Sequence, residues 1–138
     1  MQQKNNLLQA GLLVLRVGIG ISIFLHGYPK IAGGVETWTM VGSTMSNFGI
    51  DFAPAFWGFL GAFGESVGGL LFALGLLFRP AALLLTGTMA VALATHLSAG
   101  DSFMIFGHAL DLLIVFAASI LIGPGKYSFD AKFFPRIA

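Results

Sequence analysis

The chain has 138 residues, of which 57% are apolar and only 9% are charged, and its mean hydropathy is +0.89. A soluble domain carries about a quarter charged residues, so this composition excludes a water-soluble fold. The absence of cysteine excludes disulfides, thiolate-bound iron–sulfur clusters, c-type haem and thiol redox chemistry. Four apolar stretches each have the length of about 20 residues that a membrane-spanning helix needs. We therefore predict an all-α integral membrane protein, a four-helix bundle that forms a single domain over residues 1–138.

The first apolar stretch covers residues 7–27, and a polar connection follows it. The stretch is longer than a signal-peptide core, lacks a small-x-small cleavage site and contains Arg16, so we expect it to remain in the mature protein. In the connection, apolar residues including Trp38 recur at a helical spacing over residues 35–47. This segment is too short to span a membrane. It predicts a short interfacial helix between the first two spanning helices, with an ordered loop as the alternative.

The other three stretches are predicted to span the membrane over residues 54–78, 80–97 and 104–122. Proline opens the second span at a first-turn position, and Arg79 followed by Pro80 ends it. The connection to the third span is so short that these two helices must form an antiparallel hairpin. A Gly-Pro-Gly sequence closes the fourth span, and a short polar tail follows.

Basic residues outside the predicted spans lie almost all on one side of the membrane. Only Lys30 falls on the outer side, whereas the side of the termini carries Lys4, Arg79, Lys126, Lys132 and Arg136. Loops rich in Lys and Arg stay in the cytoplasm. We therefore expect a multi-pass protein of the cytoplasmic (inner) membrane with both termini in the cytoplasm.

Two oppositely charged residues fall at mid-depth within predicted spans. Arg16 precedes His26 by 10 residues, and Glu65 follows Pro54 by 11 residues. At about 1.5 Å per residue, both would lie about 15 Å below the outer surface. A lone charge at that depth costs about 3 kcal/mol or more. We therefore predict a buried Arg16–Glu65 ion pair, which either fixes the helix register or takes part in proton or substrate handling.

The three histidines are predicted to converge on the outer face of the bundle. His26 ends the first span, His96 ends the third and His108 begins the fourth. Asp111 lies one turn deeper on the same face as His108. We expect these four side chains to share one cavity, which suits a quinone because a quinone needs a histidine donor and an acidic group that exchanges protons. A metal site, a b-type haem and histidines wetted by solvent are the alternatives, and we expect no metal and no built-in cofactor.

Motifs at four places along the chain are similar to those of one family. They are His26-Gly27-Tyr28-Pro29-Lys30 after the first span, Glu65 with Gly68-Gly69, Arg79 after the second span, and Gly123-Pro124-Gly125-Lys126-Tyr127-Ser128-Phe129-Asp130 after the last. With these motifs the chain resembles the DoxX family over nearly its whole length. Members are small four-helix membrane proteins of bacteria and archaea. The resemblance thus implies the same architecture that the hydropathy predicts independently.

The resemblance also implies a function. One branch of the family is the small subunit of a thiosulfate:quinone oxidoreductase, so we expect a membrane subunit of a redox complex that is linked to a quinone. The expected partners are the lipid bilayer and a protein of that complex, with a homo-oligomer as a further option and no nucleic acid. The alternatives are a non-enzymatic scaffold or assembly factor and, less favoured because no repeat is evident, a small transporter. Whether the chain is itself an enzyme stays open.

Overall fold

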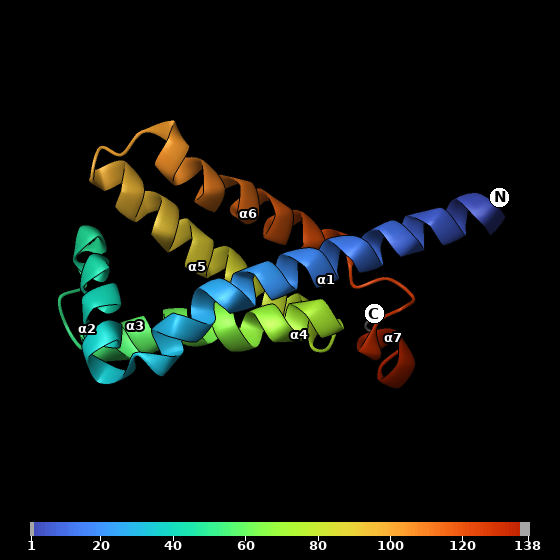
Figure 1. The fold of residues 1–138 in the computed structure, drawn as a ribbon, viewed down its shortest axis with the longest axis horizontal. Helices are drawn as coiled ribbons and strands as arrows, with labels where there is room; N and C mark the ends of the chain where they lie inside the picture. Colours follow the sequence, from blue (N-terminus) through green and yellow to red (C-terminus); the bar gives the residue numbers. More distant parts are fainter. Residues whose placement is uncertain (1, 136–138) are drawn as a thin grey trace.

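The computed structural model describes residues 2–135, and Arg136 of the predicted orientation signal lies outside them. Within this range, four helices are long and apolar enough to cross a membrane. They are α1 (Gln2–Ala32), the continuous helix made of α3 (Pro54–Phe63), η2 (Gly64–Gly68) and α4 (Gly69–Leu74), α5 (Phe78–Ser98) and α6 (Phe103–Ile122) (Figure 1). The predicted all-α fold with four apolar spans is confirmed, and the chain is a multi-pass membrane protein.

The polar connection between α1 and α3 folds into α2 (Gly34–Gly42) and the 3-10 helix η1 (Ser43–Phe48). The short helix that the sequence predicts at this place is confirmed. Figure 1 shows α2 lying across the end of the bundle instead of running along it. The backbones of α2 and α3 touch where Gly42 meets Gly58, because a Cβ atom on either glycine would overlap backbone atoms of the other helix.

Two helix pairs make up the bundle. α1 runs antiparallel to α3–α4, with Gly20 against Gly69 and Gly27 against Ser66, so these helices meet at small residues. α5 and α6 form a second antiparallel pair. Figure 1 shows the two pairs meeting near the middle of the bundle and diverging toward the end that carries α2. The buried core between them consists of Ile23, Phe72, Phe78, Ala81, Ala82, Leu85, Met89, Leu112 and Phe116.

The second spanning helix is shorter than its predicted range. It ends at Leu74, before the predicted boundary at residue 78, because Gly75 adopts a left-handed conformation with a φ of 65°. Leu77 also has a positive φ, 47°, which is unfavourable for a residue that carries a Cβ atom. The turn from α4 to α5 is therefore a strained structure that its surroundings must stabilise.

The C-terminal tail supplies that stabilisation through a buried carboxylate. Asp130 lies in the short helix α7 (Phe129–Phe133) and is 4% exposed. Its Oδ1 accepts a hydrogen bond from the N–H of Leu77 and its Oδ2 accepts one from the N–H of Phe78, both at 2.8 Å. Asp130 thereby caps the start of α5 from a distant part of the sequence.

Arg16 binds the same region from α1. Its guanidinium group donates to the carbonyl oxygens of Leu74 and Tyr127, and it interacts electrostatically with Asp130. We call Arg16 and Asp130, with the backbone groups that they bind, the tail latch. The tail latch joins α1, the turn between α4 and α5, and the C-terminal tail.

Candidate functional site

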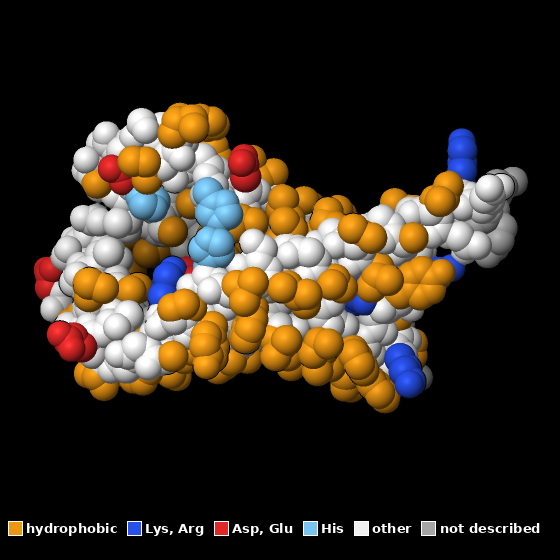
Figure 2. Space-filling view, in the orientation of Figure 1, with side chains coloured by type: hydrophobic (Ala, Val, Ile, Leu, Met, Phe, Trp, Pro, Cys, Tyr) orange, Lys and Arg blue, Asp and Glu red, His pale blue; other side chains and the backbone are white. Residues whose placement is uncertain are grey.

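A cavity of about 630 Å³ lies beside α2 and η1, between the α1–α3 pair and α5. This volume is within the range of about 300–1,000 Å³ that is typical of small-molecule sites. Figure 2 shows a hollow on this side of the molecule, with histidines and one basic side chain at its rim. Most lining residues are apolar, among them Met40, Trp57, Leu60, Leu84, Val91 and Ala92. The cavity is therefore the candidate functional site.

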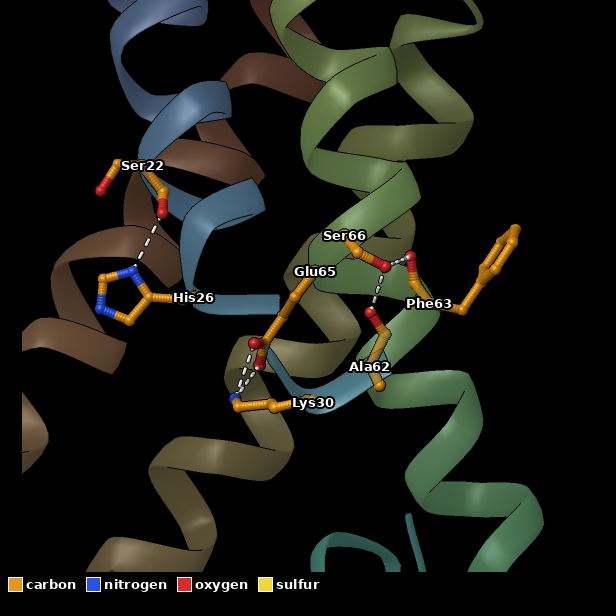
Figure 3. Close-up of polar contacts among 7 residues, drawn as sticks. All are labelled: Ser22, His26, Lys30, Ala62, Phe63, Glu65 and Ser66. Atoms are coloured by element: carbon orange, nitrogen blue, oxygen red, sulfur yellow. Dashed lines mark hydrogen bonds and ion pairs between the residues drawn. The ribbon is translucent and has the colours of Figure 1, made fainter. Parts of the chain in front are cut away.

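One ion pair stands at the wall of the cavity. Lys30 Nζ, from the last turn of α1, lies 2.8 Å from Glu65 Oε1 and 2.6 Å from Glu65 Oε2 (Figure 3). The Glu65 side chain is 7% exposed and the Lys30 side chain 38%, so the carboxylate is withdrawn while the ammonium group reaches the cavity. Trp38 of α2 steadies this turn by donating from its Nε1 to the carbonyl oxygen of Lys30 at 3.1 Å. Glu65 is an ionisable residue inside a spanning helix, which makes this pair a candidate for function.

Glu65 lies in a local widening of its helix. η2 (Gly64–Gly68) is a π-helical turn within an otherwise α-helical span, and such turns occur frequently at functional sites. The Ser66 hydroxyl donates to the carbonyl oxygen of Ala62 at 2.6 Å, which satisfies an acceptor of the disturbed turn (Figure 3). Gly27 packs on the backbone at Glu65 and Ser66, where a Cβ atom would not fit. The π-helical turn and the small residue opposite it together fix the position of Glu65.

A histidine–carboxylate pair lies at the edge of the cavity. His96, in the last turn of α5, lines the cavity, and its Nδ1 lies 2.7 Å from Asp101 Oδ2. Because the carboxylate accepts, Nδ1 is the donor in this bond, and Nε2 is left to exchange a proton with a ligand or with water.

The predicted Arg16–Glu65 ion pair is wrong. Both residues are buried, at 4% and 5% exposed, but Glu65 pairs with Lys30 and Arg16 belongs to the tail latch. The residue of α1 that packs on Glu65 is Gly27. Arg16 precedes it by 11 residues along the helix, a separation of about 16 Å.

The structure does not bring the four predicted site residues into one cavity. Among them only His96 lines the cavity. His26 and His108 contact each other outside it, with ring centroids 5.3 Å apart, and Asp111 is exposed on α6. Among residues 2–135, no three His, Asp or Glu side chains come close enough to hold a metal ion together.

Lys30 is missing from the predicted site because it falls beyond the predicted end of the first span at residue 27. α1 continues through Pro29 to Ala32, so Lys30 stays on the helix and can reach Glu65. The sequence nevertheless contains an indication that Lys30 has an acidic partner. Lys30 is the single basic residue that the predicted topology places on the outer side, where an isolated cation near the membrane suggests an acidic partner.

The DoxX family model matches residues 11–98, well over half of the chain. This chain belongs to the DoxX family. The match to this DoxX protein runs from α1 to the end of α5, so it includes Lys30, Glu65 and His96 and ends before α6. No curated protein and no solved structure matches the chain.

We expect Lys30→Ala to lower the free energy of unfolding by about 2 kcal/mol, because it leaves the Glu65 carboxylate buried without its counter-charge. Glu65→Ala should cost less, because the longer and more exposed Lys30 side chain can turn toward solvent. The double variant Lys30→Met with Glu65→Gln removes both charges and should recover most of the loss. Unfolding by SDS titration in mixed micelles measures all three, and additive losses without recovery would contradict the pairing.

Proposed function

We propose that this DoxX protein is a membrane subunit of a redox complex and that it binds a quinone in the cavity. The observation that supports this most directly is the distribution of polarity, since apolar walls surround the Lys30–Glu65 pair and His96. A quinone has the matching distribution, because its flat apolar ring carries two carbonyl oxygens. A volume of about 630 Å³ accommodates the ring and the first part of an isoprenoid tail.

The lining residues offer complementary groups for each part of such a ligand. Trp57 and Leu84 supply apolar surface from α3 and α5 for the ring. The Lys30 ammonium group can donate a hydrogen bond to one carbonyl oxygen of the quinone. The protonated His96 ring can donate a hydrogen bond to the other. Charge-assisted hydrogen bonds of this kind are stronger than neutral ones, so they would fix the orientation of the ring.

A bound quinone supplies redox chemistry by taking up two electrons, which a redox protein of the complex would deliver, and two protons. Lys30 would donate a proton to one carbonyl oxygen, and His96 would donate one to the other when its Nε2 is protonated as well. Glu65 lies 2.6 Å from the Lys30 ammonium group and Asp101 lies 2.7 Å from Nδ1 of His96, so each proposed donor has a carboxylate beside it. These two pairs would supply the two protons to a bound quinone.

The proposed location is the cytoplasmic membrane, with both termini in the cytoplasm. The distribution of charge in Figure 2 supports this orientation, since the acidic side chains visible there gather toward the end that carries α2. Lys4 and Lys126 lie near the opposite end, where the tail contacts α1. Basic residues favour the cytoplasmic side of a membrane. The cavity would then open near the outer surface.

The proposal is tested first by extraction of the purified protein with organic solvent and identification of the lipids that it retains. We expect a quinone in about stoichiometric amount. Binding of a short-chain quinone to delipidated protein can then be followed by quenching of tryptophan fluorescence, because Trp57 lines the cavity.

We expect the folded double variant Lys30→Met with Glu65→Gln, and separately His96→Gln, to weaken quinone binding about tenfold or more, which corresponds to the loss of one charge-assisted hydrogen bond. Lys4→Met is the matched control, because Lys4 is exposed on α1 at the other end of the molecule, and it should bind like the wild type. Equal binding by all variants, or no quinone in the extract and no quenching, would overturn the proposal and favour a scaffold.

A further inference from the structure

His26 and His108 form a pair of imidazoles outside the cavity, where α1 and α6 approach each other. Their ring centroids lie 5.3 Å apart, and the ring planes are inclined by 31°. Both side chains are exposed at the surface of the protein. Neither residue lines the proposed quinone site, and the pair has no role in the function proposed above.

The backbone fixes the protonation of one ring. His26 Nδ1 lies 2.9 Å from the carbonyl oxygen of Ser22. A carbonyl oxygen only accepts hydrogen bonds, so Nδ1 carries the proton and Nε2 of the neutral ring keeps a free lone pair. Metal-binding histidines in proteins are oriented in the same way, because the ring nitrogen that does not bind the metal donates its N–H to a carbonyl oxygen. Figure 3 shows the free edge of the ring pointing away from Ser22 and from Glu65.

The spacing of the two rings matches a shared tetrahedral ion. Zinc binds imidazole nitrogen at about 2.0–2.1 Å, so the centres of two imidazoles on one tetrahedral zinc would lie roughly 5 Å apart. The observed centroid distance is 5.3 Å. From this agreement and the free Nε2 of His26, we propose that His26 and His108 form a zinc site between α1 and α6, with water in the remaining positions.

The donor set selects among metals. Neutral imidazole nitrogens suit zinc and other late first-row ions, whereas Ca²⁺ and Mg²⁺ prefer oxygen ligands. Asp111 lies one turn from His108 on α6, but it does not complete a group of three ligands in the described structure. Two protein ligands with open positions give an exchangeable site, unlike the closed four-ligand sites of structural zinc.

Zinc at this position would connect the two helix pairs of the bundle. α1 belongs to one pair and α6 to the other, and the pairs diverge toward this end of the molecule (Figure 1). A ligand that binds only the folded arrangement stabilises it by mass action. Zinc should therefore raise the thermal stability of the protein in detergent.

The test uses full-length protein from which any affinity tag has been cleaved, with Zn²⁺ binding measured by equilibrium dialysis and melting followed by circular dichroism. We expect one zinc per chain and a higher melting temperature with zinc. His26→Gln and His108→Gln should each lower the affinity at least about tenfold and abolish the zinc-dependent shift in melting. His96→Gln is the matched control, because His96 pairs with Asp101 at the cavity, and it should bind zinc like the wild type.

Three results would overturn this site. They are no zinc binding by the wild type, unchanged binding in both His26→Gln and His108→Gln, and an equal loss in His96→Gln. The glutamine variants replace exposed side chains, so each is expected to fold, and its spectrum without zinc checks this directly. Tetrahedral Co²⁺ gives an independent readout, because its visible absorption should appear in the wild type and disappear in the two variants.

Discussion

Replacing Asp130 by alanine is expected to lower the free energy of unfolding by about 4 kcal/mol. The change leaves the N–H groups of Leu77 and Phe78 without their acceptors, and each buried orphan donor costs about 1–3 kcal/mol. It also removes a charge that interacts with buried Arg16. Leu77 would moreover lose the contact that holds its positive φ.

Two further variants test whether the loss of stability comes from the hydrogen bonds that Asp130 accepts. Asp130→Asn keeps one accepting oxygen and should cost about half as much. Lys132→Ala, in the same short helix but with an exposed side chain, should change stability by less than about 0.5 kcal/mol. SDS titration in mixed micelles measures the three values. A loss for Asp130→Ala as small as that for Lys132→Ala would show that the tail latch does not stabilise the turn.

Replacing Gly58 by alanine should separate α2 from α3 and cost about 3 kcal/mol or more. The new Cβ atom would overlap the carbonyl group of Trp38 and lie 2.8 Å from the backbone nitrogen of Gly42. Backbone atoms cannot rotate away as side-chain atoms do, so the helices themselves must move. Because Trp38 also holds Lys30 in place, the wall of the cavity should loosen with α2.

Tryptophan emission reports this separation directly. The two tryptophans of the chain, Trp38 and Trp57, lie on α2 and α3, and Trp38 packs edge-on against Phe59 with ring centroids 5.0 Å apart. Gly58→Ala should shift their emission to longer wavelength and lower the melting temperature. Gly61→Ala is the matched control, because no atom lies within 4 Å of its Cβ position. The same spectrum in both variants would argue against the close crossing of α2 and α3.

Hydropathy and spacing predicted most of the fold. Long apolar runs specify spanning helices because lipid offers no partner to an unpaired backbone. The one-sided spacing around Trp38 likewise predicted the short helix α2. What hydropathy could not show is the return of the tail, since the burial of Asp130 depends on contacts with Leu77 and Phe78, far away in the sequence.

The register of α1 against α3–α4 explains why the ion pair was predicted incorrectly. The prediction assumed that His26 and Pro54 lie at the same level. α1 instead runs on to Ala32, and the start of α3 packs against α2 beyond the end of α1. Glu65 consequently lies level with Gly27 and within reach of Lys30. The depth of a residue in the membrane can be counted from the end of its helix only when the neighbouring connection contains no helix of its own.

Only part of the site was predicted, because topology does not give the directions of side chains. Topology placed His96 at the outer end of its helix, and it does line the cavity there. Topology gives the end of a bundle but not the direction in which a side chain faces. His26 and His108 contact each other, and neither lines the cavity.

The π-helical turn restricts which sequence changes this lineage can accept. A π-helical turn holds about one residue more than the α-helical turn that it replaces, so deleting one residue from residues 64–68 would favour a regular α-helix without rotating the rest of the span. Phe72, which is fully buried, would keep its place in the core, and Ala73 would keep its contact with Gly20. The deletion would instead remove the local widening that positions Glu65. Relatives that keep an acidic residue here should therefore also keep the length of this helix.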